Sequence, residues 1–348
     1  MKKILTIVGT RPEIIKMFPL IKELDKFFNQ KIVLSGQHYN KNMVNNFFKD
    51  LNIRTPDFSI RINNKNNFIF EFGKRLVKII NTYKPEAIIY HGDTFTTLIS
   101  SIVSYYIFPN IKNVHIESGY RSKGNLYIED KIRIIVDKIS KINFVSRLEE
   151  KKNLNKEGIK KNIYIVGNTI TDCVEEIKKK IKKNFHKKNY VYATIHRAEN
   201  VDSKHRLQKI FKFLNFISKE IDILISLHPR TKKMLKKYRL YKSKNIRFVD
   251  SVNYSKNLSY LNNSLFCITD SGGLQEECII IGKKCFIPAK STPHFHYIKK
   301  NANELIDLNI NKFRPVLKKI LNKKILVKKF YHKKNVSKKI CHILLKKI

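Results

Sequence analysis

The chain has 348 residues, which is enough for two domains with substantial cores. Its 71 basic and 28 acidic residues give a formal net charge of +43, an excess typical of proteins that bind nucleic acid or anionic membranes. The lysines, however, are spread along the whole chain, and no apolar run reaches the roughly 20 residues of a membrane span. We therefore predict no specific nucleic-acid partner and no membrane insertion, whereas the positive field would favour an acidic metabolite.

Five cysteines lie in or beside apolar segments, and none forms a Cys-x-x-Cys pair: Cys173, Cys267, Cys278, Cys285 and Cys341. An odd number without metal-binding spacing indicates reduced thiols, so we predict no metal site, no cofactor and a cytoplasmic protein. The first residues, MKKILTIVGTRPE, contain an apolar run that breaks at Gly9 and Arg11 and is too short for a signal peptide.

Short apolar runs alternate with longer helical patterns along the chain. Strands are predicted at residues 4–9, 31–36, 86–92, 113–117, 142–146 and 163–167, and then at 190–196, 222–228, 246–250, 265–270 and 285–288. Such alternation is typical of parallel sheets covered by helices on both faces, so the predicted fold class is α/β. The two series of strands predict two domains, residues 1–168 and 169–333, divided near a lysine-rich helix after Gly167.

Polar residues directly after the strands are the candidate site residues, because ligands of open parallel sheets bind at the carboxyl ends of the strands. The motif GTRPEIIK follows the first strand. Helix capping explains Pro12 and Glu13, but it does not explain Arg11. Arg11 and Lys16 would suit a phosphate group at the start of the helix.

Carboxylates follow two later strands, Asp93 in HGDT and Glu117 in ESGYR. A single carboxylate in such a position is more often a helix cap or an ion-pair partner than a catalytic group. Glu129, Arg133 and Asp137 are spaced four residues apart in IEDKIRIIVDKIS, which places them on one helical face. We predict that these residues form a cluster with Asp93 and Glu117, and a salt-bridged helix is the alternative for the last three.

In the second half, the stretch ITDSGGLQEE places two glycines between a predicted strand and a helix that is expected to stop at Gly282. The first turn of a helix has unpaired N–H groups, and glycine lets an anion approach the backbone closely. Ser271, Gly272 and Gly273 are therefore predicted to cradle a diphosphate. Glu277, one turn farther along, is predicted to bind the ribose diol. A tight turn that merely needs small residues is the alternative.

Two further strand ends carry His196-Arg197 and His228-Pro229-Arg230. A histidine in such a position can be a purely structural hydrogen-bond donor. Two histidine and arginine pairs beside the glycine turn favour a phosphate pocket on the second sheet.

Eight motifs, in order and with compatible spacing, resemble the UDP-N-acetylglucosamine 2-epimerase family: GTRPEIIK, GQHY, HGDTFTTL, HIESGYR, GNTITD, IHRAENVD, HPRT and TDSGGLQEE. The resemblance spans residues 2–310. It implies a glycosyltransferase-B-like fold, in which two Rossmann-like domains face each other across a cleft and a C-terminal helix at about 334–348 crosses back onto the first domain. It also implies a UDP-sugar substrate, and we expect a homodimer. GTRPEIIK is closer to the non-hydrolysing branch than to the branch that releases N-acetylmannosamine.

The resemblance also implies roles for individual residues. The family's catalytic carboxylates match Asp93, Glu117 and Glu129, and we add His196 to the predicted catalytic set. The family's UDP-binding positions match Arg11, His196, Ser271, Gly272, Gly273 and Glu277. Our predicted substrate-binding residues further include Lys16, Arg133, His228 and Arg230.

This chain departs from the family pattern in three places. A proline and an asparagine of the family's Pro-Glu-Glu-x-Asn-Arg motif are replaced by Ile128 and Ile132. The segment STPHFHY, residues 291–297, replaces the usual Thr-Glu-Arg-Pro-Glu, which leaves the sugar preference open. The chain is also somewhat shorter than usual, so the regulatory substrate site around Gln37 and His38 is not assumed.

The expected chemistry is inversion at C2 of UDP-N-acetylglucosamine to give UDP-N-acetylmannosamine, a precursor of cell-surface polysaccharides. The C2 proton is not beside a carbonyl, so UDP would leave first, a carboxylate would remove the C2 proton to give a glycal, and UDP would then add back. The enzyme alternatives are a hydrolysing 2-epimerase and a glycosyltransferase with the same two-domain plan. A basic nucleic-acid-binding protein is the non-enzymatic alternative, but no recognition helix, aromatic RNP pattern or zinc spacing supports it.

Overall fold

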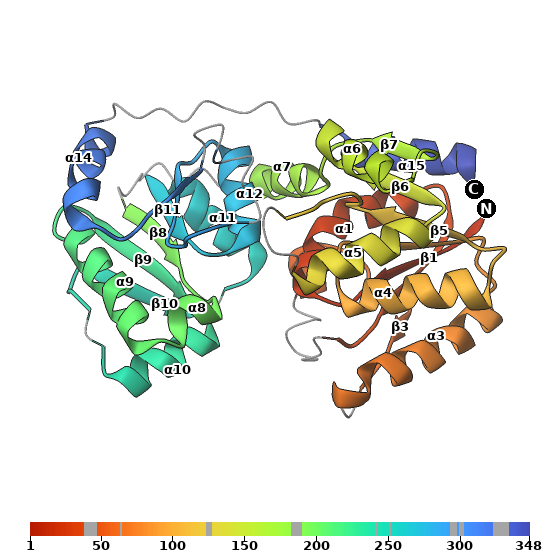
Figure 1. Ribbon diagram of the computed structural model, residues 1–348, viewed down its shortest axis with the longest axis horizontal. Helices are drawn as coiled ribbons and strands as arrows, with labels where there is room; N and C mark the ends of the chain where they lie inside the picture. Colours follow the sequence, from red (N-terminus) through yellow and green to blue (C-terminus); the bar gives the residue numbers. More distant parts are fainter. Residues whose placement is uncertain are drawn as a thin grey trace. The chain divides into compact units, whose positions relative to one another are not determined.

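The computed structural model describes residues 1–37, 47–62, 65–122, 127–181, 190–240, 242–250, 252–292, 298, 303–322 and 334–348 (Figure 1). Contacts divide the chain into two compact units. Unit 1 contains Met1–Glu176 and His332–Ile348, and unit 2 contains Ile177–Tyr331. The first division falls inside a helix, eight residues after the predicted boundary between residues 168 and 169, because the end of the first strand series and the start of that helix belong to the same compact unit.

Among the described residues, the sheet of unit 1 has seven strands, all parallel, in the order β3-β2-β1-β4-β5-β6-β7. Their bounds are β1 Lys3–Val8, β2 Asn29–Leu34, β3 Phe58–Ser59, β4 Ala87–His91, β5 Lys112–Ile116, β6 Ile142–Val145 and β7 Ile163–Ile165. The central strands β1 and β4 are buried almost throughout, since helices cover both faces of a parallel sheet.

The described helices of unit 1 include α1 Arg11–Leu24, α3 Phe68–Tyr83, α4 Phe95–Ile102, α5 Ile128–Ile139, α6 Leu148–Lys156 and α15 Val336–Lys347, and α7 Ile170–Lys180 is divided between the two units. The 3-10 turn η1 spans Lys65–Asn67, and the π-helix η2, Val103–Ile107, continues α4. One core cluster joins Leu5 and Tyr90 of the sheet to Phe72 of α3 and Val136 of α5. The C-terminal helix α15 packs against α1 within this unit.

In the part of unit 2 that the structure describes, the sheet has six parallel strands in the order β10-β9-β8-β11-β12-β13. Their bounds are β8 Tyr190–Thr194, β9 Asp222–Leu227, β10 Ile246–Asp250, β11 Phe266–Thr269, β12 Cys285–Ile287 and β13 Asn303–Leu305. Its described helices include α8 Ala198–Val201, α9 Lys204–Ile217, α10 Pro229–Tyr238, α11 Tyr254–Asn263, α12 Gly272–Ile281 and α14 Ile310–Leu321. On one face, Phe266 and Phe286 pack with Phe213 of α9 and Phe313 of α14.

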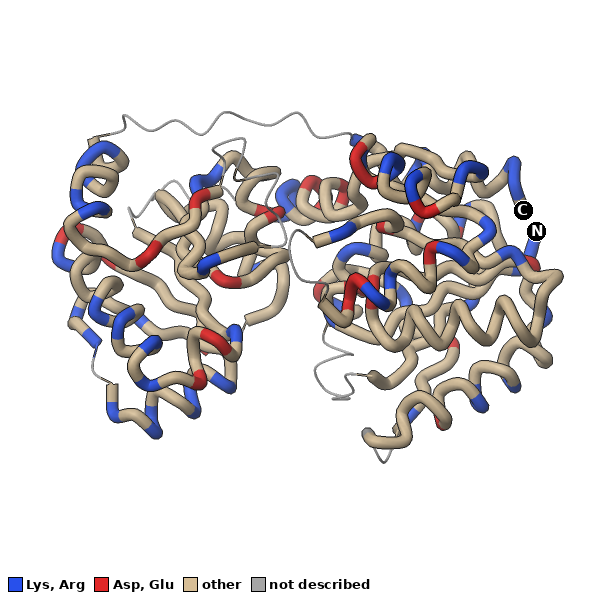
Figure 2. Tube along the Cα trace, in the orientation of Figure 1, with Lys and Arg blue, Asp and Glu red and all other residues tan. Residues whose placement is uncertain are grey.

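The predicted α/β class is confirmed, and every strand predicted from an apolar run is present with bounds that differ by at most two residues. The edge strands β3 and β13 were not predicted, because they have only two and three residues and carry no apolar run. Lys and Arg are scattered over the described parts of both units in Figure 2. No helix in the described ranges is both long and apolar enough to cross a membrane.

Candidate active site

Glu117, the first residue after β5, has a left-handed backbone with φ of +65°. A residue with a Cβ atom pays about 1–2 kcal/mol for this conformation, so neighbouring groups must hold it in place. The main-chain oxygen of Glu117 accepts a hydrogen bond from Arg133, and Gly119 N–H donates to Asp137 at 3.0 Å. Gly119 is itself left-handed, and a Cβ atom there would lie 2.6 Å from the carbonyl oxygen of Glu150. The turn therefore fixes the direction of the Glu117 side chain.

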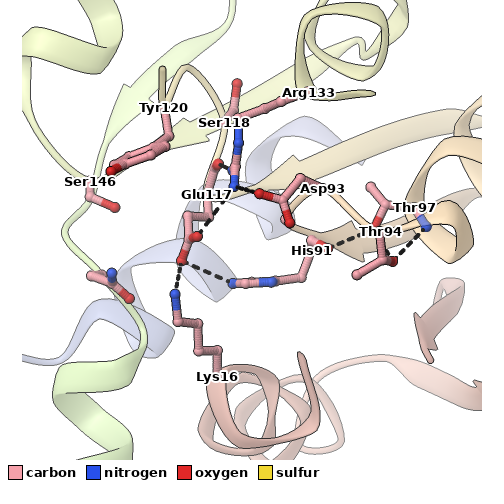
Figure 3. Close-up of polar contacts among 12 residues, drawn as sticks. Lys16, His91, Asp93, Thr94, Thr97, Glu117, Ser118, Tyr120, Arg133 and Ser146 are labelled. Atoms are coloured by element: carbon pink, nitrogen blue, oxygen red, sulfur yellow. Dashed lines mark hydrogen bonds and ion pairs between the residues drawn. The ribbon is translucent and has the colours of Figure 1, made fainter. Parts of the chain in front are cut away.

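The Glu117 carboxylate lies among three basic side chains (Figure 3). Its nearest neighbours are Lys16 Nζ at 2.5 Å, His91 Nε2 at 3.4 Å and Arg133 Nη2 at 3.6 Å. Burial alone would raise the pKa of Glu117, but the charges of Lys16, His91 and Arg133 outweigh it and hold the pKa well below its ordinary value. Glu117 is therefore an ionised carboxylate at neutral pH, which can accept a proton or stabilise positive charge.

Asp93 follows β4 and shares Arg133 with Glu117. The Arg133 guanidinium donates to Asp93 Oδ2 and lies 5.4 Å from the ring centre of Tyr120. The Arg133 side chain is only 3% exposed, whereas that of Asp93 is 31% exposed. Asp93 is thus the carboxylate of this group that is most open to solvent.

Beneath these residues, Asp137 organises the turn that carries Glu117. Its carboxylate accepts hydrogen bonds from Ser118 Oγ at 2.6 Å and Arg121 Nη2 at 2.8 Å, and His115 Nδ1 lies 2.7 Å away. The other ring nitrogen of His115 lies 2.7 Å from the carbonyl oxygen of Gly92, next to Asp93. Asp137 and His115 are completely buried. Asp137 is therefore a positioning residue that connects the ends of β4 and β5.

Glu13 connects the ends of β1 and β4 in a similar way. It accepts hydrogen bonds from Gly9 N–H at 2.8 Å, Thr10 N–H at 2.7 Å and Thr94 Oγ1 at 2.6 Å. Burial raises the pKa of Glu13 above its ordinary value, despite these hydrogen bonds. The predicted capping role of Glu13 is confirmed, and the contact with Thr94 adds a link to the start of α4.

The low pKa of Glu117 predicts a specific dependence of stability on pH. A carboxylate whose pKa is lowered by folding stabilises the native state fully above its unfolded pKa, near 4.5, and this stabilisation declines as the pH falls through the folded value. The difference in unfolding free energy between wild type and Glu117→Gln should not decrease between about pH 8 and pH 5, and should decrease below that range. Urea denaturation at a series of pH values measures it. A difference that already declines between about pH 7 and pH 5 would contradict the assignment.

Two other predicted residues of unit 1, Arg11 and Glu129, have different surroundings. Arg11 is the first residue of α1, and its guanidinium lies 4.8 Å from the ring centre of Phe47. Glu129, in the first turn of α5, is exposed and makes no hydrogen bond or ion pair with any residue that the structure describes. The predicted cluster thus brings together Asp93, Glu117 and Arg133, whereas Glu129 stays a prediction. The i,i+4 ion pairs considered for α5 are not formed, because Arg133 and Asp137 turn inward to other partners.

The GQHY motif lies partly within the described chain. Gln37 Oε1 accepts hydrogen bonds from the N–H and Oγ1 of Thr96, at 3.0 and 2.7 Å, at the start of α4. His38 and residues 293–297 of the STPHFHY segment lie outside the described residues. Ile132 is buried and Ile128 is exposed, so an asparagine side chain at 132 would have needed a polar partner in the core.

In unit 2, the strand-to-helix turn predicted at the two glycines is confirmed. Helix α12 begins at Gly272 with Ser271 as its N-cap residue, and it ends at Gly282, whose φ is +80°. A Cβ atom added at Gly273 would meet no described atom within 4 Å, so packing within the protein does not require glycine there. The missing side chain leaves space directly at the helix N-terminus, where N–H groups and the helix dipole favour an anion. Glu277 is buried, one turn along α12.

Asp270, which precedes this turn, connects it to the end of β8. Its carboxylate accepts hydrogen bonds from His196 N–H at 3.0 Å, Arg197 N–H at 3.0 Å and Asn200 Nδ2 at 2.9 Å. His196 Nδ1 lies 3.2 Å from the same carboxylate, and the imidazole is 37% exposed. The ring centre of His228 is 5.5 Å from that of His196. Asp270 therefore gathers the predicted histidines beside the glycine turn.

The Arg230 side chain forms an ion pair on the surface of unit 2. Its guanidinium pairs with Asp202, with Nε donating at 2.9 Å, and both side chains are largely exposed. His228 is the N-cap residue of α10 and accepts from Arg230 N–H at 3.2 Å. Structural roles thus account for the contacts of His228 and Arg230, and phosphate binding by either residue stays a prediction.

Three residues with central positions were not singled out from the sequence: His91, Asp270 and Thr94. His91 is the last residue of β4, Thr94 is the N-cap residue of α4, and Asp270 directly follows β11. All three belong to the strand-end motifs HGDT and TDSGG. Their position was the available signal. Which strand-end side chain turns inward, however, depends on neighbouring strands that are distant in sequence.

Comparison with known proteins adds an independent line of evidence. The sequence model of the UDP-N-acetylglucosamine 2-epimerase family matches residues 22–345. The chain belongs to this family. A family member from Methanocaldococcus jannaschii, UDP-N-acetylglucosamine 2-epimerase, is 35% identical over 343 residues, covering 92% of this chain and 93% of the relative.

Solved structures and other relatives extend this comparison. The crystal structure of Methanocaldococcus jannaschii UDP-GlcNAc 2-epimerase in complex with UDP-GlcNAc and UDP has a TM-score of 0.85 at 32% identity, covering 99% of each chain. Another family member, UDP-2,3-diacetamido-2,3-dideoxy-D-glucuronate 2-epimerase of Pseudomonas aeruginosa, is 31% identical over 316 residues, covering 87% of this chain and 88% of the relative. The family thus contains enzymes that are named for different UDP-sugars.

Proposed function

We propose that the protein inverts the configuration at C2 of UDP-N-acetylglucosamine to give UDP-N-acetylmannosamine, in agreement with its family. The observation that carries the proposal is the ionised Glu117 among Lys16, His91 and Arg133, beside Asp93 at the ends of β4 and β5. A relative whose crystal structure contains UDP-GlcNAc and UDP shares the fold at 32% identity. The reaction must remove and return the C2 proton, which no neighbouring carbonyl activates, so it requires positioned acid and base groups.

The proposed reaction proceeds through elimination and re-addition. The bond between C1 and the diphosphate oxygen breaks, UDP leaves with the electron pair, and positive charge develops at C1. A carboxylate then removes the C2 proton, and the electrons of the C–H bond form the C1–C2 double bond of a glycal. Protonation of C2 from the opposite face and return of UDP to C1 complete the inversion. Glu117 and Asp93 are the buried and the more open carboxylate available for these proton transfers.

Unit 2 is proposed to bind the UDP part. The diphosphate would accept hydrogen bonds from the first-turn N–H groups of Gly272 and Gly273 and from the hydroxyl of the N-cap residue Ser271, where the space over Gly273 supports close approach. The N–H of Ser271 itself donates to Thr269 Oγ1 at 3.0 Å. Glu277 would bind the ribose, and His196 is proposed as a further group of the site. The proposal also assigns substrate contacts to Arg11 and Lys16 of unit 1.

Between the two types of 2-epimerase, the proposal assigns the protein to the non-hydrolysing type, in which UDP stays on the product. Support comes from the GTRPEIIK motif, whose Glu13 holds the β1–α1 turn and whose Lys16 contacts Glu117. A hydrolysing 2-epimerase and a different UDP-hexosamine, such as the substrate named for the Pseudomonas aeruginosa relative, are the alternatives. A cytoplasmic location is proposed because all five cysteines are free thiols.

The reaction is tested in heavy water. Because the glycal route returns a solvent-derived proton to C2, incubation with UDP-N-acetylglucosamine should give UDP-N-acetylmannosamine with deuterium at C2, without added nicotinamide cofactor or metal. NMR spectroscopy and mass spectrometry of the products measure this. Free N-acetylmannosamine plus UDP would identify the hydrolysing type. No exchange with any UDP-hexosamine, despite tight UDP binding, would instead favour the glycosyltransferase alternative.

We also propose that the protein is a homodimer that uses an apolar surface of unit 1. Large side chains are exposed on the adjoining elements α3, α4, η2 and α5, namely Ile69, Phe70, Phe95, Tyr105, Tyr106, Ile107 and Ile135. Exposed apolar patches of this kind mark association surfaces.

The Tyr106 side chain is 71% exposed and should lie at the centre of this surface. Tyr106→Lys is therefore expected to weaken dimerisation by about 2 kcal/mol or more, and sedimentation velocity measures this change. Phe27→Lys, at an exposed residue after α1, is the control. Monomeric wild type would contradict this part of the proposal.

A further inference from the structure

Three cysteines of unit 2 converge in its core. Cys267 of β11 and Cys285 of β12 occupy paired positions on neighbouring parallel strands, and Cys278 lies on α12. Their Sγ atoms all lie within 4.8 Å of one another, and each residue is completely buried. Their neighbours in sequence, Phe266 and Phe286, contribute to the aromatic cluster with Phe313 of α14. The three sulfur atoms are therefore gathered between the sheet and α12.

Buried cysteines often serve only as small apolar side chains, and Cys173 and Cys341 in unit 1 are examples of buried cysteines outside this group. Cys267, Cys278 and Cys285 differ because they present three sulfur atoms to a common point. An ion bound at about 2.3 Å from three sulfurs in a plane requires the sulfurs to be roughly 4.0 Å apart. The observed triangle needs to contract by less than about 1 Å to reach this geometry.

We propose that Cys267, Cys278 and Cys285 form a binding site for a soft metal ion with three sulfur ligands, and that this ion is Cu(I). Thiolates select soft ions, whereas a structural Zn²⁺ site takes four ligands. No His, Asp or Glu of the described chain joins the three cysteines as a fourth donor. The sequence predicted no metal site because these cysteines are 11 and 7 residues apart, without the short spacing of a metal motif.

Cysteines bind a metal ion as thiolates, so binding requires these thiols to lose protons. The positive charge of the bound ion assists that loss. This inference does not depend on the proposed epimerase activity.

Anaerobic titration of the reduced full-length protein with Cu(I), in competition with a colorimetric Cu(I) chelator, tests the site. One ion per chain is expected to bind tightly. Loss of an outer-shell partner alone lowers metal affinity by about 10–100-fold, so Cys278→Ala, which removes a ligand, should lower it by at least about 100-fold. Cys173→Ala and Cys341→Ala remove buried cysteines outside the group and should leave the affinity unchanged. Equal affinity in Cys278→Ala and in the two controls would overturn the proposal.

X-ray absorption of the wild-type protein loaded with Cu(I) provides a test that needs no variant. Three sulfur ligands at about 2.3 Å are expected. Two sulfur ligands, or coordination by nitrogen and oxygen, would overturn the site even if Cys278→Ala failed to fold. Titration with Zn²⁺ tests whether the preferred ion is Cu(I). Tight 1:1 binding of Zn²⁺ to the three sulfurs in preference to Cu(I) would contradict this part of the proposal.

Discussion

Replacing Glu117 by glutamine is expected to lower kcat for epimerisation by about a hundredfold or more, the usual scale for an acid-base group. The substitution keeps the shape of the side chain but removes the negative charge that faces Lys16, His91 and Arg133. A neutral amide can neither accept the C2 proton nor stabilise positive charge at C1. UDP affinity should be nearly unchanged, because Glu117 is not among the residues proposed to bind UDP. Steady-state kinetics and calorimetry with UDP measure the two quantities.

Glu149→Gln is the matched control, since Glu149 is an exposed glutamate of the same unit, in the first turn of α6. It should retain the kcat of the wild type. Wild-type turnover by Glu117→Gln would remove Glu117 from the catalytic assignment. A loss of UDP affinity as large as the loss of kcat would instead indicate that the substitution disturbs the whole fold.

Replacing Asp270 by alanine is expected to lower the free energy of unfolding by about 3 kcal/mol, because one buried and two partly buried donors lose their acceptor at about 1–3 kcal/mol for a buried donor. These donors are the N–H groups of His196 and Arg197 and the side-chain amide of Asn200. Since Asp270 also connects the end of β8 to the turn before α12, UDP affinity should fall by about tenfold or more in the folded fraction. Urea denaturation and calorimetry with UDP measure the two effects.

Asp250→Ala provides the comparison for this effect. Asp250 ends β10, and its side chain is 79% exposed in a surface pair with Lys232. Exposed ion pairs contribute little to stability, so this variant should behave as wild type in both measurements. If Asp270→Ala were as stable as Asp250→Ala, the carboxylate would not hold the two strand ends together.

Most of the fold could be predicted from the sequence because both sheets are parallel and buried. Each central strand must then be a continuous apolar run, as in residues 86–92, which became β4, and 265–270, which became β11. Edge strands escape this rule. β3 and β13 are short and gain their conformation from pairing with β2 and β12, so their own residues gave no signal.

The candidate site could be predicted in part. Asp93, Glu117 and the turn at Gly272 stand at strand ends, and parallel topology alone brings strand ends to one edge of a sheet. The orientations of the side chains could not be predicted in this way. Arg133 turns toward Asp93 and Glu117, while Arg230, which looked equally suited to an anion, pairs with Asp202 on the surface.

The sequence by itself determined the α/β class, the two strand series and membership of the 2-epimerase family, because apolar runs and ordered motifs are local properties of the chain. Only the tertiary structure decided which charges meet. The low pKa of Glu117 results from Lys16, His91 and Arg133, which come from three other elements. The same holds for Cys267, Cys278 and Cys285, whose spacing shows no motif although their sulfur atoms converge. Interactions between charges and between a metal ion and its ligands depend on the distances between atoms. These distances are set only when strands far apart in sequence pair and helices pack onto them.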